Sequence, residues 1–188
     1  MKFHRLSIPD VLLIEADCIV DERGFFSETF REDKFAEQAI HVHFIQENRS
    51  LSGQAGTLRG LHFQAPPRAQ DKLVRVIQGS ILDVAVDIRE GSPTFGRSVS
   101  VEISKQNELQ IFVPKGFAHG FVTLEPNTEV LYKTSNYFAP DCDRGIFWND
   151  PDLAIDWKLN SEPILSARDR IMPLFLDLPK GLFPYDRL

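Results

Sequence analysis

Two histidines lie in segments whose composition predicts β-strands, and they are the side chains of this chain best suited to chemistry. His62 lies in the segment Gly56–Gln64, and His119 lies in the segment Pro114–Phe121. Three protein ligands are the usual minimum for a catalytic zinc or non-haem iron centre, so two isolated histidines predict no metal site. Because an unperturbed imidazole titrates near pH ~6.5, a histidine without a metal can act as a general base at neutral pH.

A buried, hydrogen-bonded residue is the alternative interpretation of His62. Strict alternation along a strand places Gly60 and Gln64 on the face of His62 and turns Arg59 to the opposite face. Gly60 would let a ligand or another backbone segment approach closely. Arg59 and His62 can therefore line one site only if the strand contains a bulge or the arginine makes a long reach.

Three further side chains have both a structural and a chemical interpretation. Lys72, at the start of an expected strand, is either a solvated residue or a cation that stabilises an oxyanion. Tyr132 is either a core or rim residue or a proton donor. Asp169 fits the third position of a helix capped by Ser166, which by itself is a structural role. The sequence has no P-loop, dinucleotide-binding fingerprint, nucleophile elbow or HExxH motif, so it gives those chemistries no support.

Length, charge and cysteine usage narrow the class of protein. A chain of 188 residues predicts one domain spanning residues 1–188, and the formal net charge of −6 argues against a generic nucleic-acid-binding protein. Cys18 and Cys142 lack the spacing of a zinc site and suit a reducing compartment. No apolar run is long enough to span a bilayer and no secretory leader follows Met1, so we expect a cytoplasmic protein without a membrane partner.

Short β-rich segments separated by turns predict an all-β sandwich or barrel. Strands are expected at Val11–Glu15, Phe25–Phe30, Phe44–Gln46, Thr57–Phe63, Lys72–Gln78, Ile81–Ile88, Val99–Ile103, Leu109–Val113, Phe117–Leu124 and Thr128–Thr134, with one short helix at Glu32–Ala39. The Gly79-Ser80 pair predicts a hairpin between the two strands that flank it. In the second of these strands, Asp83 and Asp87 alternate with an apolar face. We expect residues 8–170 to form the barrel and its site, and the apolar tail 171–188 to pack on the barrel or on a partner subunit.

Taken together, the motifs resemble those of the dTDP-4-dehydrorhamnose 3,5-epimerase family. The matching runs lie between about Ile8 and Arg170 and include Asp21–Glu28, Phe44–Ser50, Leu58–Gln64, Asp71–Arg75, Asp83–Asp87, Pro114–Phe121, Leu131–Lys133, Trp148–Pro151 and Leu165–Asp169. The resemblance implies a cupin-type double-stranded β-helix, or jelly roll, with a few short helices, bound to no metal or cofactor and assembled as a homodimer. It also implies dTDP-4-dehydro-6-deoxy-glucose as the nucleotide-sugar substrate. The most common pathway it implies is dTDP-L-rhamnose biosynthesis for cell-surface polysaccharide, and the biosynthesis of antibiotic deoxysugars is the alternative.

The resemblance assigns roles to individual residues. His62 matches the family's catalytic base and Tyr132 its acid, while Asp169 orients the histidine and Lys72 lies near the C4 carbonyl oxygen of the sugar. The residues that match those holding the nucleotide, its diphosphate and the sugar are Arg23, Phe26, Glu28, Gln46, Glu47, Asn48, Arg59, Lys72, His119, Phe138, Asp143 and Arg168.

Three of these binding residues depart from the family pattern. Phe138 stands where a tyrosine commonly stacks on thymine, Asp143 where a glutamate is frequent, and Arg168 in place of a common lysine. Three alternatives stay open from the sequence: an epimerase that inverts only C3 or C5, a cupin that binds sugar nucleotides without catalysis, and a metal-dependent cupin oxygenase. Against the oxygenase, Gln64 and Thr123 occupy positions expected to hold metal ligands or their support.

Overall fold

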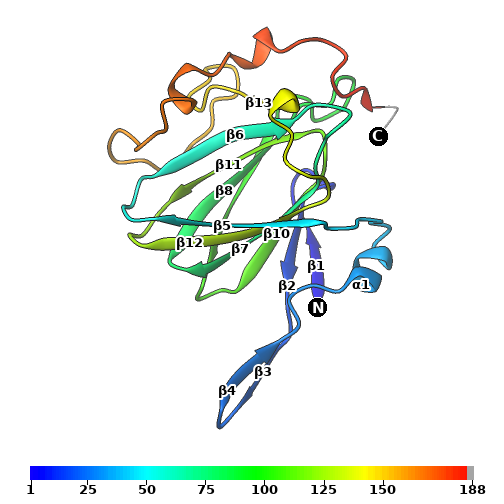
Figure 1. The fold of residues 1–188 in the computed structure, drawn as a ribbon, viewed down its shortest axis with the longest axis vertical. Coiled ribbons are helices and arrows are strands. Elements are labelled where there is room, and N and C mark those ends of the chain that lie inside the picture. Colours follow the sequence, from blue (N-terminus) through cyan, green and yellow to red (C-terminus); the bar gives the residue numbers. More distant parts are fainter. Residues whose placement is uncertain (186–188) are drawn as a thin grey trace.

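The computed structural model describes residues 1–185, and its body is formed by antiparallel strands in two packed sheets (Figure 1). The large sheet has the strand order β1 (Lys2–Arg5), β2 (Leu12–Glu15), β10 (Leu109–Val113), β7 (Lys72–Gln78), β12 (Thr128–Thr134) and β5 (Gln46–Ser52). The small sheet has the order β13 (Asp143–Gly145), β6 (Leu58–Gln64), β11 (Phe117–Thr123), β8 (Ser80–Asp87) and β9 (Ser98–Ser104). The predicted all-β jelly roll is confirmed.

Short helical turns and one isolated hairpin complete the described chain. The helices are α1 (Glu32–Ala36) and the 3-10 turns η1 (Pro140–Cys142), η2 (Asp169–Ile171) and η3 (Phe175–Asp177). Strands β3 (Cys18–Asp21) and β4 (Gly24–Ser27) pair only with each other. The sequence predicted α1 and most of the strands, but it did not predict β1, β3 or β13, and it ended β5 too early.

The predicted hairpin at Gly79-Ser80 is wrong. Strands β7 and β8 both exist, but β7 pairs with β10 and β12 whereas β8 pairs with β11 and β9, so the chain crosses from the large sheet to the small one between them. Gly79 has a φ of +77°, and a Cβ there would lie 3.0 Å from the Cα of Thr128. The glycine is therefore required by a tight crossing between sheets and not by a two-residue hairpin turn.

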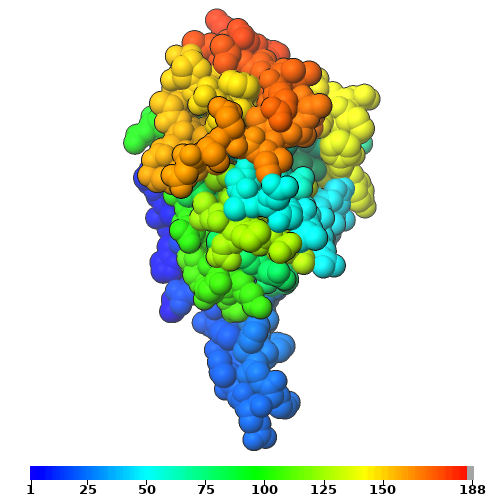
Figure 2. Space-filling view, turned by 90° about the vertical axis from the view of Figure 1, so that its left-hand side faces the viewer, coloured from blue at the N-terminus to red at the C-terminus, as the bar shows by residue number. Residues whose placement is uncertain are grey.

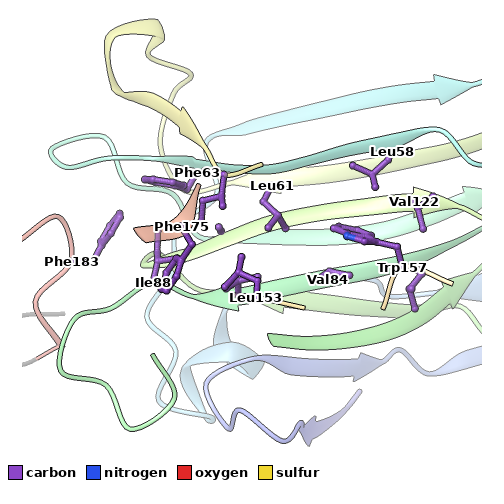
Figure 3. Packing of buried hydrophobic residues seen from close by; sticks show 14 residues of the cluster. Leu58, Leu61, Phe63, Val84, Ile88, Val122, Leu153, Trp157, Phe175 and Phe183 are labelled. Atoms are coloured by element: carbon purple, nitrogen blue, oxygen red, sulfur yellow. The ribbon is translucent and has the colours of Figure 1, made fainter. Parts of the chain in front are cut away.

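Three apolar clusters pack on the faces of the two sheets. The space between the sheets is filled by side chains such as Val74, Ile111 and Phe121. The outer face of the large sheet packs on α1 through Phe35. The outer face of the small sheet is covered by the C-terminal segment. Figure 3 shows that cluster, with labelled residues from β6, from β8 and the position after it, from β11 and from the C-terminal segment: Leu58, Leu61, Phe63, Val84, Ile88, Val122, Leu153, Trp157, Phe175 and Phe183. Both Phe175 and Phe183 are buried, so the described part of the expected tail packs on the barrel.

Strand β8 is buried along its whole length because it lies between two of these clusters. Its polar residues are therefore not a solvated face. The carboxylate of Asp87 accepts hydrogen bonds from Arg89, Ser92 and Thr94, and the carboxylate of Asp83 is paired with a histidine. Buried carboxylates persist only when they are partnered in this way.

The β3–β4 hairpin projects from the barrel as an arm (Figures 1 and 2). Its apolar side chains are exposed: Ile19 by 64%, Val20 by 75%, Phe25 by 63% and Phe26 by 68%. An apolar surface of this kind is unusual on a protein that functions alone.

Among the described residues, no helix has the length and hydropathy to cross a membrane. The last three residues of the expected tail, 186–188, lie outside the described part, and the division of the chain into barrel and tail stays a prediction.

Candidate active site

A cavity of about 480 Å³ opens between the two sheets, which is the size of a site for a small organic ligand. The large sheet contributes side chains from β5, β7 and β12, and the small sheet contributes side chains from β6 and β11. The C-terminal loops add a rim. The lining residues are Gln46, Asn48, Ser50, Arg59, His62, Phe63, Gln64, Gln70, Lys72, His119, Phe121, Tyr132, Thr134, Phe138, Asp143, Ser166, Arg168 and Asp169.

His62 and Asp169 form a hydrogen-bonded pair in this cavity. The Nε2 of His62 lies 2.5 Å from Oδ1 of Asp169, and the two side chains are 29% and 4% exposed. Burial alone would raise the pKa of Asp169, but the hydrogen bond and charge of His62 outweigh it, so the pKa lies below its ordinary value. An ionised carboxylate at this distance accepts the Nε2 proton and leaves Nδ1 as the nitrogen that can take a proton from a substrate.

The hydrogen bond expected between Ser166 and Asp169 is present, but Ser166 is not the N-cap of the helical turn. The backbone N–H of Asp169 donates to the hydroxyl of Ser166 at 3.1 Å, while η2 begins at Asp169 itself and has Arg168 as its N-cap. The carboxylate of Asp169 contacts His62, so the structural and chemical interpretations use different atoms of the residue and are compatible.

A bulge in β6 brings Arg59 to the same side as His62. Opposite β6, His119 pairs with His62 and Phe121 pairs with Arg59, so three steps on β6 face two steps on β11. Both side chains consequently line the cavity. Gly60, within the bulge, has a φ of +140°, and a Cβ there would lie 2.5 Å from the Cα of Gly120, so the close approach of the two strands requires glycine.

A second histidine–carboxylate pair lies beside the first. The Nε2 of His119 lies 2.9 and 3.0 Å from the two carboxylate oxygens of Asp83, and Asp83 is fully buried. Asp83 was not among the predicted site residues, because alternation showed only that it lay on a different face from its apolar neighbours. Its place in the middle of the apolar strand β8 was the signal that could have identified it, since such a carboxylate needs a partner.

Lys72 reaches into the cavity from the large sheet. Its Nζ donates to the backbone carbonyl of His62 at 3.2 Å. Burial lowers the pKa of Lys72 to about 8, although the negative charges of Asp83 and Asp143 act in the opposite direction. The amine is therefore mostly an ammonium at neutral pH, held close to the strand that carries His62.

Tyr132 faces His62 across the cavity, because it comes from β12 of the large sheet whereas His62 comes from β6 of the small sheet. Burial raises the pKa of Tyr132 above its ordinary value, against the lowering effect of the positive charge of Arg59. The phenol stays protonated at neutral pH, as a proton donor must. Two candidate proton-transfer groups thus occupy opposite walls of one cavity.

The rim contains all three residues that depart from the family pattern. Phe138 is 56% exposed, and its backbone N–H donates to Oε1 of Gln46 at 2.9 Å. Arg168 and Asp143 contact each other, with Nη1 and Oδ2 at 2.6 Å. Two of the three departures expected from the sequence thus form one ion pair at the rim.

Four of the predicted binding residues do not line this cavity. Arg23, Phe26 and Glu28 lie on or next to the β3–β4 arm, where Arg23 pairs with Asp21 and Glu28 lies 3.7 Å from Arg31. Glu47 points to the outer face of the large sheet, and its carboxylate lies 2.5 Å from Nζ of Lys133. Alternation along β5 explains the difference, because Gln46 and Asn48 point inward on either side of Glu47.

Within residues 1–185, no group of three or more histidine, cysteine or acidic side chains converges in a way that could hold a metal ion. Gln64 and Thr123, at the positions considered for metal ligands, are buried and hydrogen-bonded to protein groups.

Comparisons with known proteins relate this chain to one enzyme family. The family model for dTDP-4-dehydrorhamnose 3,5-epimerase matches residues 5–177. The dTDP-4-dehydrorhamnose 3,5-epimerase of Pseudomonas aeruginosa is 50% identical over 178 residues, which is 94% of this chain and 97% of the relative.

Two solved structures extend the likeness to three dimensions. The rmlC epimerase of Mycobacterium tuberculosis superposes with a TM-score of 0.93 at 43% identity, covering 98% of this chain and 94% of the other. A dTDP-6-deoxy-D-glucose-3,5-epimerase from Legionella pneumophila, solved with dTDP-4-keto-L-rhamnose, superposes with a TM-score of 0.92 at 42% identity and covers 97% of both chains. The match to the family model over residues 5–177, the 50% identity and the shared fold show that this chain belongs to the dTDP-4-dehydrorhamnose 3,5-epimerase family.

Proposed function

We propose that this protein inverts C3 and C5 of dTDP-4-dehydro-6-deoxy-D-glucose and so forms dTDP-4-dehydro-L-rhamnose, in the biosynthesis of dTDP-L-rhamnose. The observation that carries the proposal is the placement of His62 and Tyr132 on opposite walls of one cavity. Inversion of a carbon needs a proton to leave from one face and another to arrive on the opposite face, and one group on each wall supplies this arrangement.

His62 is the proposed base. Its Nδ1 takes the proton from C3, the C–H electron pair forms a C3–C4 double bond, and the C4 carbonyl oxygen becomes an enolate oxygen. Tyr132 then gives its proton to C3 from the opposite face, and the enolate collapses to the ketone. Exchange with solvent then removes the added proton from His62 and returns one to Tyr132. The same sequence at C5 completes the reaction, which needs no electron donor or acceptor. Asp169 holds the tautomer of His62 that leaves Nδ1 able to accept a proton.

Lys72 is the proposed stabiliser of the enolate. It lies in the cavity with its ammonium beside the backbone of His62, so it is close to the place where the proton is removed. A fixed donor aimed at a developing oxyanion contributes roughly 3–4 kcal/mol to the rate where this has been measured. The neighbouring Arg59 and Arg168 add positive charge to the cavity and suit a diphosphate, despite the net negative charge of the chain.

A homodimer follows as the proposed assembly, with the β3–β4 arm reaching the site of the second copy. Two observations support it: the arm exposes four large apolar side chains, and it carries binding residues that its own cavity does not contain. In this arrangement Arg23, Phe26 and Glu28 of one subunit complete the substrate site of the other, while the apolar residues of the arm are covered. The cytoplasmic location stays a prediction from the sequence.

Mixing two inactive variants tests the exchange of arms. One variant carries His62→Asn, and the other carries Arg23→Ala with Glu28→Ala. After the two are mixed and allowed to exchange subunits, a mixed dimer contains one site with an intact His62 and an intact arm from its partner. We expect activity to return toward one quarter of the wild-type value, as random pairing predicts. A mixture that stays as inactive as its components, although native mass spectrometry shows that mixed dimers have formed, contradicts the proposal.

Proton exchange tests the reaction itself. In deuterium oxide with dTDP-4-dehydro-6-deoxy-D-glucose, we expect proton NMR to show loss of the signals at both C3 and C5 as deuterium enters. Exchange at C3 alone would identify an enzyme that inverts a single carbon. Absence of exchange at both carbons, from a protein that is folded and dimeric, would contradict the proposed reaction.

A further inference from the structure

The segment that carries Phe138 to the cavity rim is held by side-chain amides and not by a regular strand. It follows β12 and precedes η1, and residues 137–139 belong to neither element. Three glutamines that line the cavity hydrogen-bond to its backbone. Gln70 donates to the carbonyl of Asn136 at 2.8 Å, Gln46 accepts from the N–H of Phe138 at 2.9 Å, and Gln64 binds the residues on both sides of Phe138.

Gln64 makes the most extensive of these contacts. Its Nε2 donates to the carbonyl of Arg68 at 2.6 Å and to the carbonyl of Tyr137 at 3.1 Å, and its Oε1 accepts from the N–H of Ala139 at 2.6 Å. A primary amide has two N–H donors, so both are already used by the protein. Gln64 is also 4% exposed, although it lies two residues from His62 on the same strand. Its side chain is therefore built to hold backbone and not to bind a ligand directly.

We propose that Gln64 is a positioning residue, whose amide clamps Tyr137 and Ala139 so that the ring of Phe138 stands at the rim as a stacking surface for the pyrimidine base of the nucleotide. The inference rests on the proposed nucleotide-sugar substrate and deepens it. An exposed phenylalanine on an irregular segment gains little from its own packing, so its orientation must come from the backbone on either side. Stacking depends on that orientation, because a flat base needs a ring that is already parallel to it.

The position of Gln64 on β6 also connects the nucleotide site to the proposed catalytic base. The same strand carries His62, so the base of the reaction and the clamp for the nucleotide platform are set by one element. The distance between the reacting sugar and the pyrimidine is thereby fixed by strand geometry, while Gln64 itself takes no part in the chemistry.

Binding of dTDP and turnover, measured together, test the inference. We expect Gln64→Met to raise the Kd of dTDP in isothermal titration calorimetry by about tenfold, the size of effect associated with loss of a base–aromatic stack. At saturating substrate, kcat should stay within about twofold of wild type, because His62, Tyr132 and Lys72 are unchanged. If Gln64→Met does not fold, Gln64→Glu keeps the shape while removing both donors, and the same pattern is expected.

A double-mutant cycle distinguishes the loss of Phe138 positioning from a general loss of protein stability. In a Phe138→Ala background, Gln64→Met should change the Kd of dTDP by less than about twofold, because the ring that it positions is already gone. Thr123→Val is the matched control: Thr123 is buried and hydrogen-bonded on the neighbouring strand β11, and it contacts Gln54 and Thr57 and not the Phe138 segment. This variant should lower the melting temperature but leave the Kd unchanged.

The outcomes are distinguishable. Full additivity of the Gln64 and Phe138 substitutions, an unchanged Kd in Gln64→Met, or a kcat that falls as much as the affinity would each overturn the positioning role while leaving the epimerase function in place. Failure of the wild-type protein to bind dTDP would instead contradict the proposed function from which the inference starts.

Discussion

The two histidine–carboxylate pairs of the cavity are neighbours, yet they are built differently. His62 and His119 face each other across β6 and β11. The imidazole of His62 keeps 29% of its surface exposed and contacts one oxygen of Asp169, which lies in η2, 107 residues away in the sequence. The imidazole of His119 is 8% exposed and lies against both oxygens of Asp83 from the adjacent strand β8.

Both imidazoles face a carboxylate through Nε2, so the carboxylate alone does not distinguish their roles. A base must reach the carbon whose proton it removes, and the larger exposed surface of His62 suits it to that role. We expect His119, which is held between packed strands, to contribute to ligand binding and not to proton transfer. Four experiments test this distinction and are given in order of decreasing effect.

Removal of His62 should have the largest effect. We expect His62→Asn to lower kcat by at least about 10³-fold, within the range of general-base catalysis, while the KM and melting temperature change little. Deuterium exchange at C3 and C5 would be lost with it. A variant that keeps activity within a few-fold of wild type would show that another group removes the proton, and His119 would be the first to consider.

The partner of the base should come next. Asp169→Asn keeps the size of the side chain but lets an amide N–H face the imidazole and favours the wrong tautomer, so we expect kcat to fall on the order of 10²-fold. The pKa of Asp169 lies below its ordinary value, so the carboxylate should stay ionised across the neutral range. Equal losses in Asp169→Asn and Asp83→Asn would remove the distinction between the two pairs.

His119 should affect binding more than turnover. His119→Gln replaces the ring with a group that can still donate one hydrogen bond, and we expect the KM to rise about tenfold with kcat within a few-fold. Steady-state kinetics beside a dTDP titration would locate the loss. A fall in kcat with an unchanged KM would instead place His119 in the proton transfer.

The smallest expected effect is a shift in the pH dependence of kcat/KM, and it connects the His119–Asp83 pair to Lys72. The ammonium of Lys72 is the active form, and its pKa is about 8, so kcat/KM should decline as the pH rises through that value. The charge of Asp83 raises this pKa, and Asp83→Asn should therefore move the alkaline limb to lower pH, by less than about one unit. Asp177→Asn, on an exposed residue outside the cavity, is the control and should leave the limb in place. If the alkaline limb of the kcat/KM profile does not move in Asp83→Asn, Asp83 acts on His119 alone.

Much of the fold could be predicted from the sequence because alternation and turn residues are local signals. The strands from Lys72 to Thr134 and the helix that begins at Glu32 lie close to their predicted bounds. The connection at Gly79-Ser80 was mistaken for a hairpin because a glycine turn looks the same whether the next strand pairs beside the previous one or in the facing sheet.

The site was harder to predict because its geometry depends on contacts that are distant in sequence. Alternation correctly separates Gln46 and Asn48 from Glu47, but it places Arg59 on the wrong face, since no local rule reveals an extra residue in β6. The pairing of Asp169 with His62 came only from the family resemblance. Nothing in the sequence showed that Arg23 and Phe26 lie on an arm outside their own cavity.

The bulge at Gly60 has a consequence for comparing and redesigning such chains. A substitution of Gly60 would look like a trivial change in a pairwise alignment, with every other motif letter in its place. A Cβ there would lie 2.5 Å from the Cα of Gly120, so β6 could not keep the bulge unchanged. If β6 became a regular strand of the same length, alternation would exchange its inner and outer faces on one side of residue 60. Either the guanidinium of Arg59 would enter the apolar layer under the C-terminal segment, or the imidazole of His62 would. The three-residue spacing of Arg59 and His62 serves one site only because Gly60 permits the bulge.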